Sequence, residues 1–292
     1  MTIIVGFSAS RQGSAPVNLA AQLARSTGEK IVAAVIAERA PAARVSPVEE
    51  EFQTQVAAHA TKSLAQLIDP ISHNLDVSIV THESSSIPAG LMELVEQHAA
   101  DMVVVGSSSS GLLGRVALGS VTDRLVHTAA VPVAIAPRGY PPGLTPVQRL
   151  TAAYGGAADA VGLIATTAEL ALRWSVRMRI TSFTVRASAT FGGAVARTAE
   201  DLVVQQWAHQ VEQSILGQLD AVAADVPLPD VEVKVGAGTE WSQAVDTIGW
   251  EHGDILLLGS GAAGPVAQVF LGSAASKIIR HAPVPVMIMP RR

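Results

Sequence analysis

The sequence contains no cysteine, so neither a disulfide framework nor thiol chemistry is available to it. It has no long run of basic residues and a formal net charge of −5, which argues against nucleic acid as a partner. Its purely apolar runs are far shorter than the roughly 20 residues that span a bilayer. No basic region precedes a secretory apolar core at its start. We therefore expect a cytoplasmic location and no membrane partner.

The eight histidines show no spacing typical of a metal site, and neither a Walker motif nor a G-x-S-x-G motif occurs. Hydrophobic residues make up 49% of the chain and charged residues 15%, which is typical of a folded protein rather than a disordered one. The sequence thus predicts a folded chain with no metal site and no catalytic residues.

The sequence does contain a long internal repeat. Residues 254–291 repeat residues 101–138 at a constant offset, without insertion or deletion. A repeat of this length corresponds to a whole domain rather than to a short solenoid unit. We predict two similar domains, residues 1–140 and 147–292, joined by a linker rich in proline and glycine at 138–146.

Short apolar runs alternate with longer helical segments in each half, a pattern typical of a parallel sheet covered on both faces. We predict an α/β fold of two tandem, open, five-stranded parallel sheets of Rossmann-like type. The predicted strands are 3–6, 31–37, 77–81, 102–105, 131–136, 150–154, 178–185, 231–235, 255–258 and 284–289. The predicted helices are 15–26, 48–68, 87–99, 120–128, 160–174, 199–223, 240–251 and 273–280.

A glycine-rich loop follows a buried strand in each half and leads to a Gly-Ser pair at the start of a helix. In the first half it runs from Gly106 to Gly119 and Ser120. Glycines allow sharp turns and close approach of a ligand, and the amides of Ser120 and Val121 would lie at the positive end of the helix. The segment therefore suits a phosphate. A tight connection without a ligand, with Ser120 and Asp123 forming a capping box, explains the same residues.

These segments resemble the universal stress protein family, whose pattern is Gly-x2-Gly-x9-Gly-Ser/Thr after the fourth strand. The spacing is complete in both halves, and the endings PVAIAP and PVMIMP are also typical. The resemblance covers the whole chain. It implies an adenine-nucleotide alpha-hydrolase-like fold and, for members with the complete motif, ATP bound with its phosphates on the glycine loop.

The chain departs from that family pattern at two positions in each half. The middle glycine is replaced by Ser109 and by Ala262. If that position needs a positive φ, a residue other than glycine costs about 1–2 kcal/mol. ATP-binding members carry an Asp after the first strand. Its place is taken by Ser8 in the first half, and by Tyr154 or Gly155 in the second.

The two halves also differ in charge beside the loop. Arg115 lies where it could reach a phosphate, or it is a solvated surface arginine, and its counterpart Gln268 is neutral. The first domain is therefore the better candidate for ATP, with or without Mg²⁺. The candidate binding residues are Ser8, Gly106, Ser109, Gly111, Gly114, Arg115, Gly119, Ser120 and Val121 in the first half, and Gly259, Ala262, Gly272 and Ser273 in the second.

The leading functional hypothesis is a stress-response protein that binds ATP as a sensor or regulator. No residue is an obvious general base, so rapid turnover is not expected and the chain is not predicted to be an enzyme. A third hypothesis, an enzyme resembling ATP pyrophosphatases, is disfavoured because residues 8–11 do not resemble the S-G-G-x-D-S loop of those enzymes.

The alternative hypothesis is a nucleotide-free stress protein that acts through dimerisation or protein contacts. The predicted strands 131–136 and 284–289 would then be sheet edges, which invite pairing. They could join the two halves as an internal pseudo-dimer or join two chains as a homodimer. All four tryptophans fall in the second half and are expected to cover its core or an interface: Trp174, Trp207, Trp241 and Trp250.

Overall fold

The computed structural model describes residues 2–8, 13–39, 47–143, 145–156, 160–185, 194–259 and 273–290. The first half contains β1 (Thr2–Phe7), α1 (Ala15–Thr27), β2 (Lys30–Glu38), α2 (Pro47–Ile68), a 3-10 turn (Asp69–Ile71), β3 (Val77–Ser84), α3 (Ile87–His98), β4 (Met102–Gly106), α4 (Ser120–Thr128) and β5 (Val133–Ala136). The second half contains β6 (Arg149–Ala153), α5 (Ala160–Trp174), β7 (Arg177–Val185), α6 (Ala194–Ala223), β8 (Val231–Gly238), α7 (Trp241–Asp246), β9 (Asp254–Gly259), α8 (Ser273–His281) and β10 (Val286–Met289).

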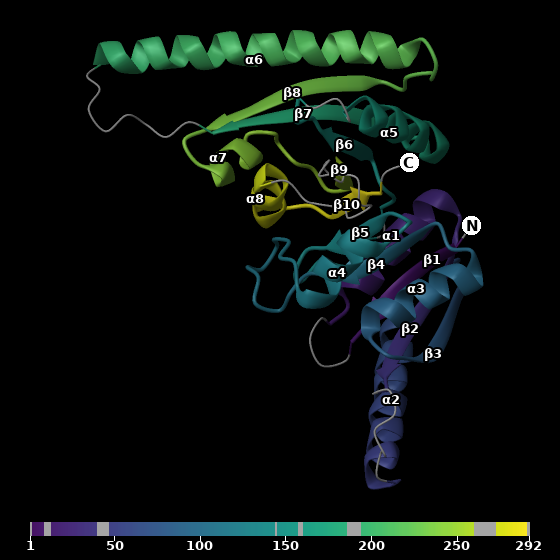
Figure 1. Ribbon diagram of the computed structural model, residues 1–292. Coiled ribbons are helices and arrows are strands. Elements are labelled where there is room, and N and C mark those ends of the chain that lie inside the picture. Colours follow the sequence, from purple (N-terminus) through teal and green to yellow (C-terminus); the bar gives the residue numbers. More distant parts are fainter. Residues whose placement is uncertain are drawn as a thin grey trace.

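All the strands form one sheet, in the order β3-β2-β1-β4-β5-β10-β9-β6-β7-β8 (Figure 1). Neighbouring strands within each half are parallel, which confirms the predicted α/β fold of two parallel-sheet repeats. In the middle, β5 and β10 pair antiparallel, with Ala134 opposite Met287. The two predicted edge strands therefore pair with each other, as the predicted internal pseudo-dimer of the two halves requires, and neither is left exposed as an edge. The outer strands are β3 and β8.

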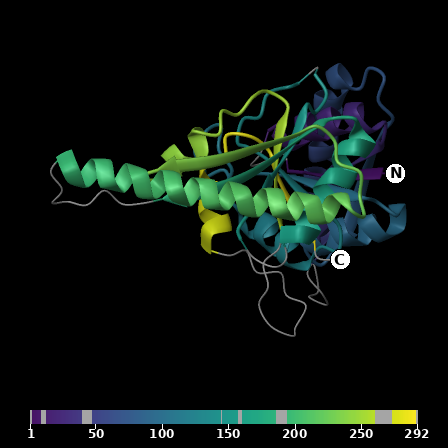
Figure 2. The same cartoon turned by 90° about the horizontal axis from the view of Figure 1, so that it is seen from above.

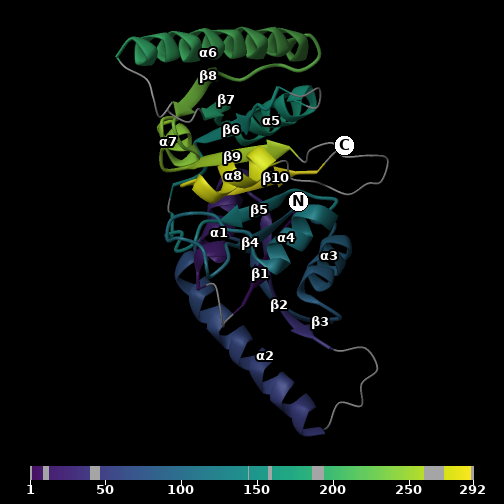
Figure 3. The same ribbon diagram turned by 60° about the vertical axis from the view of Figure 1, so that its left-hand side comes forward.

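Apolar side chains pack on both faces of the sheet. One core cluster lies under α1, α2, α5 and α6 and includes Leu23, Leu64 and Ile164. The other lies under α3, α4, α7 and α8 and includes Leu91 and Leu125. Figures 2 and 3 show α6 and α2 at opposite ends of the sheet, with α6 extending past it. None of the helices within the described ranges is both long and apolar enough to cross a membrane.

The linker lies along α1, held by polar side chains one helical turn apart. Asn18 Nδ2 donates to the Tyr140 carbonyl at 2.9 Å, and Gln22 Nε2 donates to the Thr145 carbonyl at 3.2 Å. Gln22 Oε1 also accepts from the Tyr140 hydroxyl at 2.6 Å. Asn18 and Gln22 are buried, and buried polar groups persist where they are hydrogen-bonded. These bonds therefore fix the linker and, with it, the placement of the second half.

Helix α7 ends earlier than the sequence predicted, at Asp246 instead of at 251. Gly249 adopts a left-handed backbone with a φ of 67°. A left-handed glycine commonly terminates a helix. The chain then turns back so that Trp250 Nε1 donates to the Val245 carbonyl at 2.7 Å. This early end places Asp246 and Trp250 at the seam between the two halves.

Candidate functional site

The first glycine-rich loop starts where the strand order reverses. β1 lies between β2 and β4, with Val5 opposite Val104. The chain leaves β1 towards β2 on one side and enters β4 on the other. Ser8 follows β1, and Ser107 follows β4, at the same edge of the sheet. In open α/β sheets this reversal leaves a crevice at the carboxyl ends of the strands where ligands bind.

The loop folds back on itself through Ser107. This buried side chain accepts a hydrogen bond from the Ala117 amide at 2.7 Å and donates to the Ala117 carbonyl at 3.1 Å. The Ser108 amide donates to the same carbonyl at 2.7 Å. A Cβ on Gly111 would lie 2.7 Å from the Ala117 Cβ, so this turn requires glycine. Ser107 is not among the residues predicted for this loop from the sequence. Its position immediately after a buried strand could have indicated that its side chain is buried and hydrogen-bonded.

Ser109, in place of the middle glycine, carries no left-handed strain. Among the described residues, those other than glycine with positive φ are Asn74, Ala99 and Ser175. The left-handed residue of this loop is Gly114, with a φ of 73°. The substitution of glycine by Ser109 is therefore compatible with the loop backbone. Ala262, the corresponding residue of the second half, lies outside the described residues.

Helix α4 begins at the far end of the loop without a side-chain cap. Gly119 is the N-cap residue, with extended backbone, and Ser120 is already inside the helix. The predicted capping box is therefore wrong, and Asp123 instead lies 3.6 Å from His127 Nε2. The first amides of a helix, here those of Ser120 and Val121, have no acceptor within it and carry partial positive charge. Their chemistry allows them to donate hydrogen bonds to an anion at the crevice.

Arg115 is engaged by the second half. Its guanidinium donates to Asp246 Oδ1 through Nη1 and Nη2, both at 3.2 Å, and Nη1 also donates to the His281 carbonyl. The neighbouring Arg138 fixes the loop from the other side, because its Nη1 donates to the Gly111 carbonyl at 2.7 Å. Arg115 is thus an interdomain residue in this structure and does not contribute a free positive charge to the crevice.

The strand register of the second half decides which residue corresponds to Ser8. Leu150 lies opposite Ile255, as Ile3 lies opposite Met102 in the first half. Tyr154 therefore corresponds to Phe7, and Gly155 corresponds to Ser8. The buried Tyr154 hydroxyl lies 2.8 Å from Ser214 Oγ on α6.

The described part of the second loop consists of its two ends. Gly259 is the last residue of β9, and Ser273 is the first residue of α8. The candidates Ala262 and Gly272 lie outside the described residues. At the end of β6, a Cβ on Gly155 would meet no atom of the described residues within 4 Å. Gly155 thus brings no side chain to the place where the first half has the Ser8 side chain.

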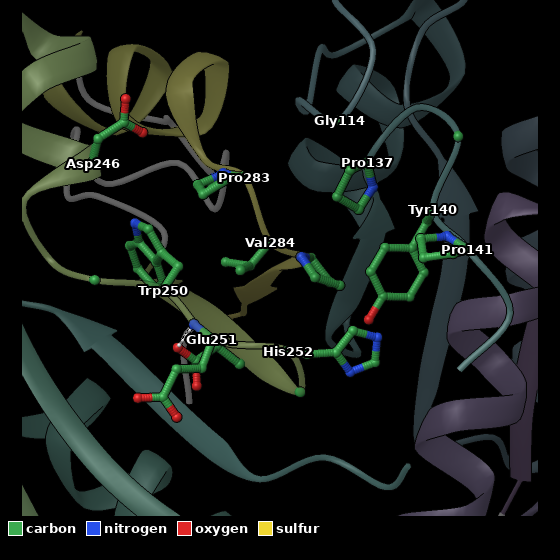
Figure 4. A pocket seen from close by; sticks show the side chains of 15 residues that line it. Gly114, Pro137, Tyr140, Pro141, Asp246, Trp250, Glu251, His252, Pro283 and Val284 are labelled. Atoms are coloured by element: carbon green, nitrogen blue, oxygen red, sulfur yellow. Dashed lines mark hydrogen bonds between the residues drawn. The ribbon is translucent and has the colours of Figure 1, made fainter. Parts of the chain in front are cut away.

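A cavity of about 530 Å³ lies at the seam between the halves (Figure 4). Tyr140 of the linker and Trp250 and His252 of the segment after α7 face it, and Gly114 of the loop reaches its border. Burial raises the pKa of Tyr140 to about 12, although the hydrogen bond to Gln22 opposes the shift. Within the described ranges, no group of three histidine or carboxylate side chains could hold a metal ion.

Comparison with known proteins gives one consistent result. The model of the universal stress protein family matches residues 1–137 and 147–290. A universal stress protein of Mycobacterium tuberculosis is 35% identical over 295 residues, which cover 99% of this chain and all of that protein.

A solved structure that matches this chain over almost its whole length shows the same fold. A universal stress protein from Archaeoglobus fulgidus has a TM-score of 0.60 and 16% identity, covering 99% of this chain and 96% of its own. A universal stress protein solved in complex with cAMP covers 48% of this chain and 98% of its own, at 23% identity and a TM-score of 0.37.

Proposed function

Because this chain belongs to the universal stress protein family, we propose that its first domain binds ATP, with the phosphates on the loop between β4 and α4. The observation that carries this proposal is the uncapped start of α4 at the strand reversal. A Cβ on Gly119 would lie 3.5 Å from the Ser108 Cβ, so glycine leaves room above the loop. The amides of Ser120 and Val121 would donate to phosphate oxygens there.

The first domain would hold the nucleotide as a signal rather than as a substrate. The Ser108 side chain lies beside Gly119 at the uncapped helix start, and its hydroxyl lies 2.8 Å from that of Ser110. Hydroxyls of this kind can hydrogen-bond to phosphate but are poor general bases. Mg²⁺ would arrive with the phosphates, because it is usually held through one or two ligands and keeps several waters. We accordingly propose a sensor or regulator without rapid turnover.

Isothermal titration of the full chain with Mg-ATP tests this function. We expect about one equivalent bound, in the first domain, because Gly155 leaves the second domain without a side chain at the Ser8 position. The complex should persist for hours without release of inorganic phosphate. No binding heat, together with no nucleotide released on denaturing the purified protein, would exclude ATP as the ligand.

Ser8→Asp is expected to raise the affinity for ATP about tenfold. A hydrogen bond to a charged group contributes about 1.5–3 kcal/mol, and the carboxylate would restore the group that ATP-binding family members carry after the first strand. Titration calorimetry measures the change. Gly155→Asp is the matched control, since the same carboxylate in the second domain should leave the first site unchanged. Equal or weaker binding by Ser8→Asp would place the adenosine elsewhere.

Protein contacts are a second candidate function, favoured by α2. Phe52 and Val56 lie one turn apart on this helix and are 65% and 51% exposed. They precede Ala60 and Leu64, which are buried in the core, so the apolar stripe of α2 continues past its packed part. If this stripe joins two chains, light scattering will give twice the chain mass for the native protein and a single mass for Phe52→Ser/Val56→Ser. A native chain that remains monomeric at high concentration excludes the homodimer.

A further inference from the structure

The glycine-rich loop of the first domain is held from two sides. On its own side, the Gly114 amide donates to the Arg138 carbonyl at 2.9 Å, and the Arg138 amide donates to the Arg115 carbonyl at 3.0 Å. Residue 138 closely follows β5, the strand that pairs with the second half. The backbone of residues 114–115 is therefore hydrogen-bonded to the segment that follows β5, at the interface between the two halves.

On the other side, the Arg115 side chain reaches the last residues of two second-domain helices. Asp246 ends α7, and His281 ends α8. The carboxyl end of a helix carries partial negative charge, which favours a bound cation. The Arg115 side chain is 29% exposed and the Asp246 side chain 52%, so the ion pair alone is worth little in water. The additional hydrogen bond to the His281 carbonyl fixes the direction in which the Arg115 side chain points.

Helix α8 connects this contact with the Gly-Ser pair of the second half. Its first residue, Ser273, is the equivalent of Ser120, and its last residue, His281, accepts from Arg115. At 1.5 Å per residue its nine residues span about 13 Å. One short helix thus joins the last residue of the second glycine motif to the loop of the first.

We propose that Arg115 is an interdomain positioning residue that orders the first-domain loop from the second domain and thereby sets its affinity for ATP. This inference rests on the proposed function. A loop held in place before the ligand arrives loses less conformational entropy on binding, so affinity is higher. Linkage is reciprocal, so ATP bound in the first domain also tightens the contact with α7 and α8.

Hydrogen exchange and calorimetry on Asp246→Asn test the proposal. The substitution lies in the second domain, outside the phosphate loop. In the absence of nucleotide, amides of residues 107–119 should exchange on the order of fivefold faster than in the native chain. The dissociation constant for Mg-ATP should rise by a similar factor, at the low end of typical coupling between sites. Asp220→Asn, an exposed carboxylate on α6, is the control and should change neither quantity.

The double variant distinguishes positioning from direct contact with the phosphates. Arg115→Met should weaken binding at least as much as Asp246→Asn, because it also removes the bond to the His281 carbonyl, and the double variant should do no more than Arg115→Met alone. If Asp246→Asn strengthens binding while Arg115→Met weakens it, Arg115 acts on the phosphates and the proposal fails. Unchanged loop exchange in Asp246→Asn also overturns it. If the native chain binds no ATP, the proposed function fails, and the exchange rates alone decide whether the interdomain link exists.

Discussion

Replacing Asp254 by alanine is expected to destabilise the second domain by roughly 3–5 kcal/mol, because it leaves a buried arginine without its partner. Asp254 is 1% exposed and Arg149 3% exposed. Arg149 Nε and Nη2 donate to the two Asp254 oxygens at 2.9 and 2.7 Å. Arg179, 1% exposed, lies 3.7 Å from the same carboxylate. Without Asp254, both arginines would have to rely on Glu232, which already contacts each of them but is half-exposed.

Urea unfolding followed by tryptophan fluorescence and by circular dichroism measures this loss. All four tryptophans lie in the second half, so fluorescence reports the domain that carries Asp254, and circular dichroism reports both halves and hence the control. Asp101→Ala is the matched control, because Asp101 holds the equivalent place in the first half but accepts a backbone amide, that of Thr2, at 3.0 Å. If Asp254→Ala is no more destabilising than Asp101→Ala, the buried ion cluster does not stabilise the fold. Arg149→Met/Asp254→Leu should recover much of the stability, since apolar residues can replace a buried pair.

Gly119→Val is expected to lower the affinity for Mg-ATP between ten- and a hundredfold. The branched side chain would occupy the space above Ser108, which the phosphates must enter to reach the amides of Ser120 and Val121. Each charge-assisted hydrogen bond lost contributes about 1.5–3 kcal/mol, which corresponds to this range of affinity. Titration calorimetry under the conditions used for the native chain gives the comparison.

The control is Gly119→Ala, which distinguishes the effect of a bulky side chain from the effect of replacing glycine itself. Gly119 has a φ of −96°, which any residue adopts, and an alanine Cβ would make an ordinary contact at 3.5 Å with Ser108. Alanine should therefore bind ATP nearly as the native chain does. Equal affinities for valine and alanine would mean that the phosphates do not approach this end of α4. The circular dichroism of both variants should stay native.

The repeat and the apolar runs were enough to predict the fold, because burying both faces of a parallel sheet requires continuous apolar strands. They also indicated that the terminal strands could pair with each other, but not whether this pairing or one between two chains is formed, since an apolar strand such as β5 can pair with any neighbour of compatible register. The early end of α7 was also missed. Gly249 stops that helix, but an isolated glycine is tolerated in many helices, so it is a weak signal.

The candidate site was predicted better in its backbone than in its side chains. Glycine spacing located the loop and the start of α4, because close turns restrict which residues fit. The direction taken by Arg115 depends on Asp246, more than a hundred residues away, and local sequence contains no trace of that contact. Asn18 and Gln22 on α1 did carry a signal. They are two polar residues one turn apart in the otherwise apolar stretch 15–24, which indicates a buried polar partner, here the linker.

The antiparallel pairing of β5 and β10 reverses the strand direction in the middle of the sheet. The carboxyl ends of the strands in the two halves therefore face opposite edges of the sheet, so no single small ligand can bridge both. Covalent connection also raises the effective concentration of one half at the other far above that of a second chain. The first half of a chain is then favoured to pair with the second half of the same chain, even if the residues of β5 and β10 do not discriminate against other partners. The two domains are consequently free to differ, as Ser8 and Gly155 do.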